Sequence, residues 1–407
     1  MNEMSSVPHF PPPPPLPASS VKADFSGDRG DFFRLVRNGA ALEVITVGFY
    51  RFWLATDIRR HLWSHTSVGG DAPEYTGRGR ELLIGFLFAL AILVPIYLAY
   101  FVITIEAERA KAFASIPLFL FFYLFGQFAI YRARRYRLTR TVWRGVRFWM
   151  DGSGWAYAMR AAGWGLLAAI TLGAALPWRE AALERYKMRH CYYGDLQGSF
   201  QGRGSDLFKR GWKLWLAALS PFLFGLVLLI ATAGHKAPVA AGVFTLAMFV
   251  WMIAMPFIYG GFKAIEWRWW LSGIRFGEVS FESDLPAGAL YGLYWKVIGW
   301  YLLITIIFTA YIFACVGLIV GFGDMAHFAT RTQGNIGVTA ATVVGYLGII
   351  IALNVALRVY LLRDVWARVA SSTTVYRLEA ANNVAAKGEL ADAVGEGLAG
   401  GLDIVGF

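Results

Sequence analysis

Six long runs of apolar residues dominate the pattern of hydrophobic and polar positions along the chain. Each run is free of charged residues and reaches the length of about 20 residues that a helix needs to cross a bilayer. The runs occupy residues 82–105, 112–131, 214–233, 238–262, 297–321 and 337–357. They predict six transmembrane helices, and the fold class expected from them is an all-α polytopic membrane protein.

Two further apolar stretches are shorter or are interrupted by charge. Residues 155–177 contain Arg160, and residues 32–54 contain four charged side chains. Stretches of this kind are often interfacial or re-entrant. We therefore expect two shorter helices that lie at, or dip into, the cytoplasmic leaflet, in addition to the six spans. Eight spans are the alternative if both stretches cross.

Positive charge is concentrated in the loops, which fixes the expected orientation. The chain has a net charge of +11, yet only 16% of its residues are charged, against about 25% in soluble proteins. Basic loops are retained on the cytoplasmic side of a membrane. The aromatic-rich basic segments suit anionic lipid head groups better than nucleic acid. Six side chains are interpreted as a lipid-facing basic belt: Arg134, Arg135, Arg137, Arg185, Lys187 and Arg268.

One segment of the chain occurs twice, at an offset of 125 residues. Residues 45–83 align without a gap on residues 170–208, with eleven identities in 39 positions. Self-similarity of this kind predicts a duplicated structural unit. The expected organisation is a disordered Pro-rich arm over 1–23, repeat units over 24–131 and 132–262, a third and divergent unit over 263–378, and a flexible tail over 379–407.

A motif of an aromatic residue followed by spaced glycines precedes several of the apolar helices. Arg78 lies between Gly77 and Gly79, and Arg203 occupies the same place in the second copy. Glycine permits the backbone conformations of a tight turn, so short β-like segments with glycine turns are expected at the cytoplasmic face. Arginine at a helix N-terminus is also a candidate for anion binding. The favoured interpretation is a structural turn, since no Walker-type Lys-Ser/Thr follows.

The candidate polar side chains form two groups. His65 and His190 occupy equivalent positions of the repeat and, with the two arginines of the glycine motifs, are the candidate interfacial anion-binding residues. Interfacial hydrogen bonding is favoured for both histidines over metal or proton handling. Gln127 and Asn354 are the intramembrane polar candidates. The six apolar runs contain no Asp, Glu or His, which argues against an ion-coupled carrier. We expect no catalytic residue, metal or cofactor.

Three segments carry a resemblance to a known family. They are FSGDRGDFFRLVRNG, ITVGFYRFWLATDIRRHLWSHTSVGG and EYTGRGRELLIGF. In these motifs and their order the chain resembles the YjgN family of bacterial inner-membrane proteins, a domain of unknown function, over residues 24–380. The resemblance implies a multi-pass protein of the bacterial cytoplasmic (inner) membrane. The family has no established activity or catalytic residues to transfer.

Three functional hypotheses follow from these observations. The leading one is a non-enzymatic membrane protein, either a passive pore or a transport or envelope-associated component. The alternative is a lipid-binding membrane scaffold that uses the basic and aromatic belts and the Pro-rich arm. A lipid-modifying enzyme at the cytoplasmic interface is the weaker alternative. The expected partner is a bilayer with anionic head groups, not nucleic acid; a homo-oligomer and a protein partner stay open.

Overall fold

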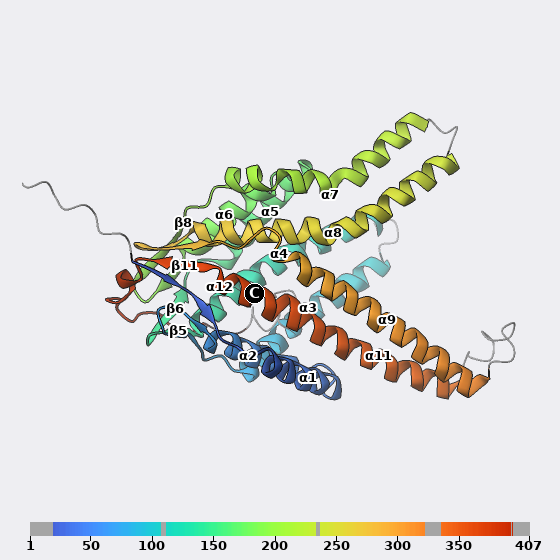
Figure 1. The fold of residues 1–407 in the computed structure, drawn as a ribbon, viewed down its shortest axis with the longest axis horizontal. Helices are drawn as coiled ribbons and strands as arrows, with labels where there is room; N and C mark the ends of the chain where they lie inside the picture. Colours follow the sequence, from blue (N-terminus) through green and yellow to red (C-terminus); the bar gives the residue numbers. More distant parts are fainter. Residues whose placement is uncertain (1–18, 107–110, 233–236, 322–334, 392, 394–407) are drawn as a thin grey trace, which may run out of the picture.

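A curved sheet lies at one end of the protein, and pairs of helices project from it in one direction (Figure 1). The computed structural model describes residues 19–106, 111–232, 237–321, 335–391 and 393. The expected Pro-rich arm lies outside these ranges up to residue 18. The expected tail lies outside them at residue 392 and beyond residue 393.

Six long helices form three hairpins. The hairpins are α3 (Gly79–Glu106) with α4 (Lys111–Thr139), α7 (Gly204–Thr232) with α8 (Ala237–Gly273), and α9 (Tyr291–Val320) with α11 (Ile336–Leu357). α11 continues through the π-helix η3 (Arg358–Arg363) into α12 (Asp364–Ser371). Within the described residues, six helices suit a membrane span in length and composition, as the apolar runs predict. Hairpins α7–α8 and α9–α11 diverge as they leave the sheet (Figure 1).

The short β-like segments join into one antiparallel sheet, which corrects the all-α expectation. Nine strands follow one another in the order β1-β11-β10-β9-β8-β7-β6-β5-β4. They are β1 (Ser20–Lys22), β4 (Glu74–Tyr75), β5 (Thr141–Trp143), β6 (Val146–Met150), β7 (Cys191–Tyr193), β8 (Leu196–Phe200), β9 (Ile274–Phe276), β10 (Val279–Ser283) and β11 (Thr373–Tyr376). β2 (Asp24–Phe25) pairs separately with β3 (Thr66–Ser67). One tight turn with positive φ at both Arg144 and Gly145 joins β5 to β6, as expected for a two-residue hairpin loop.

The sheet is curled. In a flat sheet β5 and β11, six strands apart, would be separated by about 29 Å. Yet residues next to these two strands both contact Gly69. The position that a Cβ would take on Gly69 is 3.3 Å from Arg144, just after β5, and 2.8 Å from Leu378, shortly after β11. An apolar core that includes Trp143, Tyr193 and Val375 packs with Leu378 in this region. The curvature therefore brings the distant parts of the sheet around one core.

The two shorter apolar stretches each contain the turn of a helical hairpin, not one helix. The first hairpin is α1 (Arg29–Ile45) with α2 (Arg51–Ser64), and the second is α5 (Gly154–Ile170) with α6 (Leu176–Arg189). In each turn a threonine hydroxyl accepts a hydrogen bond from the backbone, Thr46 from Tyr50 at 2.9 Å and Thr171 from Ala175 at 3.1 Å. This turn ends the first helix, and the expectation of single helices over 32–54 and 155–177 is corrected.

Both short hairpins return to the end of the molecule from which they start. α5 follows β6 and α6 leads into β7, and these two strands pair directly with each other. The chain between them therefore enters and leaves on the sheet side. We call the sheet, the two short hairpins, α12 and the last turns of α4 and α8 the head.

The first part of the expected tail, residues 379–391, contacts the sheet, and its flexibility stays a prediction. It begins with the 3-10 helix η4 (Leu378–Ala381). Asn382 accepts a hydrogen bond from Arg144 at 2.7 Å, and the amide of Ala385 donates to Asp195 at 3.0 Å. A Cβ on Gly194 would lie 2.4 Å from the carbonyl oxygen of Ala385. The segment can therefore lie across the β7–β8 turn only because that turn has a glycine.

Gly194→Ala is expected to release this segment from the sheet. The new Cβ would overlap the Ala385 carbonyl. This overpacking should destabilise the packed segment by about 1 kcal/mol, which corresponds to roughly fivefold faster opening of the segment. Trypsin cleavage after the exposed Lys387 measures the opening rate. Gly145→Ala is the matched control, since Gly145 also has a positive φ but has no atom within 4 Å of its Cβ position. Equal cleavage rates in the two variants would contradict the prediction.

Candidate functional site

Charged side chains of the long helices collect in the head because several of these helices exceed the thickness of a bilayer. α8 has 37 residues, or about 55 Å at 1.5 Å per residue, against about 30 Å of hydrocarbon. Its last turns therefore extend beyond the lipid. α11, η3 and α12 form a similarly long continuous span, from Ile336 to Ser371. The polar ends of these helices meet α1, α2 and α6 in the head.

A buried ion-pair cluster lies where α4 and α6 meet. Glu184 on α6 is only 7% exposed and pairs with Arg134 on α4 at 3.2 Å and with Lys187 one turn along α6. Burial alone would raise the pKa of Glu184, but Lys187 and Arg134 outweigh it and hold the pKa at about 2. Glu184 is therefore ionised at neutral pH and is held between two cations.

The same cluster continues toward α8. Glu180, one turn before Glu184 on α6, pairs with Arg179, and burial raises the pKa of its carboxyl group. Lys263 and Glu266 on α8 pair with each other at 2.6 Å. Burial also raises the pKa of the nearby Cys191 thiol, to about 11. That thiol is protonated at neutral pH and is not prepared as a nucleophile.

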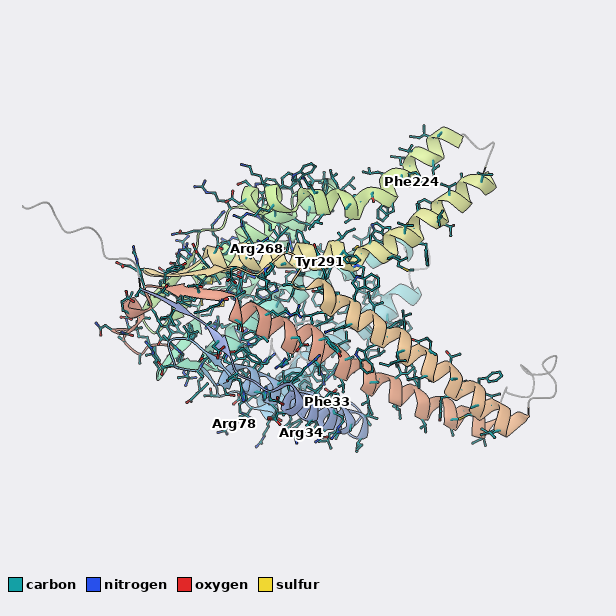
Figure 2. The ribbon with its side chains drawn as sticks, viewed as in Figure 1. Phe33, Arg34, Arg78, Phe224, Arg268 and Tyr291 are labelled. Carbon is teal, nitrogen blue, oxygen red and sulfur yellow. The ribbon has the colours of Figure 1, made fainter. Side chains whose placement is uncertain are left out.

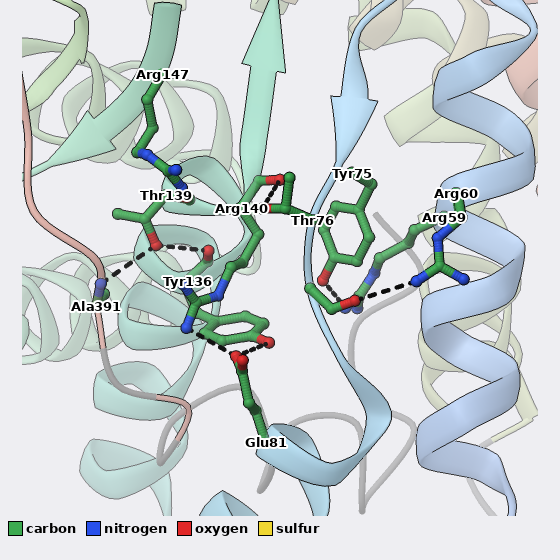
Figure 3. A network of polar contacts seen from close by, with 11 residues as sticks. Arg59, Arg60, Tyr75, Thr76, Glu81, Tyr136, Thr139, Arg140, Arg147 and Ala391 are labelled. Atoms are coloured by element: carbon green, nitrogen blue, oxygen red, sulfur yellow. Dashed lines mark hydrogen bonds and ion pairs between the residues drawn. The ribbon is translucent and has the colours of Figure 1, made fainter. Parts of the chain in front are cut away.

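A second polar network connects α3 to α4 beside the sheet (Figure 3). Glu81, in the first turn of α3, pairs with Arg140 at 2.7 Å and accepts a hydrogen bond from Tyr136 at 2.9 Å. On the neighbouring helix α2, Arg59 donates to the hydroxyl of Tyr75 at 3.2 Å. An acidic residue in the first turn also suits the positive end of the helix dipole. This network fixes the sheet end of the α3–α4 hairpin.

A third set of ion pairs connects α1 to the third long hairpin. Arg358 at the start of η3 makes a bidentate pair with Glu43 on α1, at 2.9 and 3.1 Å. Arg29 at the start of α1 pairs with Asp364 on α12 at 2.9 Å. Each short hairpin is therefore joined by buried or half-buried ion pairs to the long helix beside it.

The two arginines of the glycine motifs are exposed and lie at the starts of two different long helices. Arg78 (Figure 2) and Arg203 precede α3 and α7 respectively. The next residues, Gly79 and Gly204, pack against the backbone of Trp53 and Trp178. These contacts explain the motif as a close approach between a helix start and a short hairpin. The structure does not bring the arginines into one site, and anion binding by them stays a prediction.

His65 and His190 end α2 and α6 and make different hydrogen bonds. The Nδ1 atom of His190 lies 2.6 Å from Asp151, and Nδ1 of His65 lies 2.7 Å from the carbonyl oxygen of His61. The ring of His61 also packs on that of His65, with centroids 4.2 Å apart. In the described part of the chain, no group of three or more His, Cys, Asp or Glu side chains is placed to hold a metal.

The structure corrects the basic belt at two positions. Arg134 and Lys187 do not face lipid, because Glu184 pairs with both inside the head. Arg135, Arg137 and Arg268 are half-buried, and only Arg185 is exposed (Arg268 is labelled in Figure 2).

Because it considered only the basic residues of this segment, Arg185 and Lys187, as the belt, sequence reasoning missed Glu180 and Glu184. Their spacing of four residues, with Lys187 three residues after Glu184, is the pattern of one helix face and was the available signal.

The two intramembrane polar candidates lie in different hairpins. Gln127 is on α4 and Asn354 is on α11. The side chain of Asn354 donates to the carbonyl oxygen of Ile350 in its own helix at 3.2 Å. The structure shows no joint polar path formed by these two residues.

Large apolar side chains are exposed along the long hairpins and at the tips of the short ones. Phe224 lies on the far half of α7, remote from α9 and α11 (Figure 2). At the short tips, Val47 is 87% exposed and Leu172 is 71% exposed. A Cβ on Gly173 would lie 3.3 Å from the indole nitrogen of Trp215, so the α5–α6 tip is level with Trp215 on α7.

These long, apolar and widely exposed helices define a multi-pass membrane protein. The chain belongs to a family of bacterial proteins of unknown function (DUF898), whose profile matches residues 20–296. This match confirms the resemblance to a YjgN-type domain of unknown function. No curated protein matches the chain, and no solved structure does.

Proposed function

We propose that this protein is a non-enzymatic lipid-engaging scaffold of the bacterial inner membrane. Three spanning hairpins anchor it, and the tips of the two short hairpins insert into the nearer leaflet. The observation that carries the proposal is the exposure of apolar side chains at both tips, which lie beside the first apolar turns of neighbouring spans. The Lys- and Arg-rich segments around the head favour a cytoplasmic head.

The depth of the tips follows from their neighbours. Trp215, level with the α5–α6 tip, is two residues past Lys213, the last charged residue before the apolar part of α7. Two residues correspond to about 3 Å along a helix. On the other short hairpin, Arg51 beside the tip lies over the ring of Phe86, near the start of the apolar run of α3. Both tips therefore reach just below the head groups, where interfacial elements insert.

The divergence of the hairpins favours a scaffold over a pore in a single chain. A pore needs helices that surround a path with polar groups. Here α7–α8 and α9–α11 separate from one another away from the sheet (Figure 1), and large apolar side chains are exposed on them. Lipid between the hairpins suits this surface. A pore would require several copies of the chain.

We also propose that the two short hairpins, with the α3 and α7 starts, derive from a duplication. α1 and α5 begin 125 residues apart, as do α2 and α6, and α3 and α7. The turns match as well, with φ of 51° and 48° at Val47 and Leu172. Both copies start and end at the same sheet, so they are parallel. Inverted copies are common in alternating-access carriers, and this arrangement therefore gives no support to such a carrier.

A nitroxide spin label at each tip tests the insertion. Val47→Cys and Leu172→Cys, in a Cys315→Ala background that retains the buried Cys191, are expected to be more accessible to oxygen than to a water-soluble nickel chelate in liposomes. Oxygen concentrates in the hydrocarbon region, whereas the chelate stays in water. Ser199→Cys, exposed on the sheet, is the control and should show the opposite preference. Tip labels that behave as the Ser199 label does would contradict the scaffold proposal.

A flux assay with the same liposomes separates the scaffold from the leading alternative. The scaffold predicts that release of small ions and solutes equals that of protein-free liposomes. Release that scales with the amount of inserted protein would favour a pore formed by several copies.

A further inference from the structure

The first turns of α7 carry a group of exposed cations. Lys209, Arg210 and Lys213 are all exposed, and Lys209 and Lys213 share one face of the helix, four residues apart. No acidic side chain forms an ion pair with any of the three among the residues the structure describes. Asp206 offsets one positive charge in this region, and exposed Arg203 adds another. The local excess of positive charge is therefore free to act on a ligand.

These cations lie at the depth of lipid head groups. The uncharged part of α7 runs from Leu214 to Thr232, which is 19 residues or about 28 Å. That length matches the hydrocarbon thickness of about 30 Å. Lys213 is therefore at the boundary, and Lys209 lies one turn outside it. Trp212 and Trp215 flank the boundary, where tryptophan is enriched in membrane proteins.

An apolar surface lies directly beside the cations. Phe208 contacts the ring of Trp178 on α6, with centroids 5.3 Å apart, and Trp178 is 39% exposed. Leu172 and Leu176 at the α5–α6 tip are also exposed. Positive charge next to exposed apolar side chains matches a phospholipid, whose head group is polar and whose acyl chains begin just below it.

The other two long hairpins lack this combination. At the start of α3 Arg78 and Arg80 are exposed, but no cation follows Glu81, which is already paired with Arg140, before the apolar run. α9 has a single exposed lysine in its first turns, Lys296. A general requirement of membrane insertion would place similar charges on all three hairpins, so the cations of α7 call for a more specific explanation.

We infer that Lys209, Arg210 and Lys213, with Trp178 and the α5–α6 tip, form a binding surface for phospholipids with anionic head groups. The inference rests on the proposed scaffold function and names the lipid class that the scaffold prefers. Three cations attract an anionic head group in the leaflet next to the head, and Trp178 with Leu172 contacts the upper acyl chain. Phosphatidylethanolamine, which has no net charge, gains much less from these cations.

Native mass spectrometry of the full chain tests the inference. Protein released from nanodiscs of equal phosphatidylglycerol and phosphatidylethanolamine is expected to retain the anionic lipid preferentially. In the triple variant Lys209→Gln, Arg210→Gln, Lys213→Gln, the ratio of retained phosphatidylglycerol to retained phosphatidylethanolamine should fall roughly tenfold or more. The reason is that the variant loses three cations at the depth of the head groups. The matched control is Lys22→Gln, Arg189→Gln, Lys387→Gln. It removes the same charge from exposed positions of the sheet side and should leave the ratio unchanged.

The outcomes separate this inference from the scaffold proposal. An unchanged ratio in the α7 variant, an equal fall in both variants, or no lipid preference in the wild type would each overturn the anionic-lipid surface. None of these results changes the depth of the spin-labelled tips, so the scaffold proposal would stand. If the tips prove to be in water, the scaffold proposal fails whatever the lipid ratio.

Discussion

Glu184→Gln is expected to lower the free energy of unfolding by roughly 3–5 kcal/mol, the cost of removing one partner from a buried ion pair. The substitution keeps the size of the side chain but leaves Arg134 and Lys187 without their shared carboxylate. Both cations are largely shielded from water in the head, so solvent cannot replace the lost partner. Thermal unfolding of the purified chain in detergent, compared with the wild type, measures the effect.

Two variants show whether burial is the cause. Glu278→Gln breaks an exposed pair with Arg377 at 3.5 Å and should change stability by less than about 1 kcal/mol. The triple variant Arg134→Met, Glu184→Leu, Lys187→Met should recover much of the loss, because apolar replacements of a buried ion cluster are often neutral or stabilising. Equal effects of Glu184→Gln and Glu278→Gln would show that the cluster is not buried.

The pH dependence gives a second readout of the same pair. Since the pKa of Glu184 is lowered from 4.5 to about 2 in the folded protein, its contribution is fully present above the unfolded value of 4.5. It is lost as the pH falls from there toward 2. Acid unfolding of the wild type should therefore be steeper over this interval than that of Glu184→Gln. Parallel curves would contradict a lowered pKa.

The spans were predictable from sequence because length and the absence of charge decide them locally. Their ends were not. α8 continues to Gly273, well past the apolar run that stops at residue 262, because Lys263 and Glu266 remain helical inside the head. A hydropathy pattern records where lipid contact ends, whereas the helix ends where its backbone joins the sheet at β9.

The sheet and the ion-pair cluster depend on contacts between distant parts of the chain. The aromatic residue and glycines of each motif indicated an extended segment and a turn, but nothing local to β4 indicates that it pairs with β5 more than 60 residues later. The belt assignment of Arg134 failed in the same way. Its partner Glu184 lies 50 residues away along the chain, on α6, and nothing local to Arg134 indicates that contact. By contrast, the Thr-x-Gly pattern at residues 46–48 and 171–173 is a local signal in the sequence. It ends α1 and α5, the first helix of each short hairpin.

Gly204→Ala is expected to destabilise the protein by about 3 kcal/mol, the upper part of the range for overpacking. A Cβ there would lie 2.7 Å from the Cα of Trp178 and 2.8 Å from the carbonyl oxygen of Pro177. These are backbone atoms of α6, so no side-chain rotation relieves the overlap, and α7 must move away from the short hairpin.

Gly163→Ala is the matched control, because Gly163 lies within α5 and has no atom within 4 Å of its Cβ position. That substitution should stabilise the helix by roughly 0.5–1 kcal/mol, as alanine does in place of glycine inside helices. The two changes add the same methyl group, so an opposite sign of their effects on thermal unfolding isolates the contact between α6 and α7. If Gly204→Ala is no less stable to thermal unfolding than Gly163→Ala, the motif glycine is not required for this close approach. Since Gly79 meets Trp53 in the same way at 2.8 Å, Gly79→Ala should repeat the result at the start of α3.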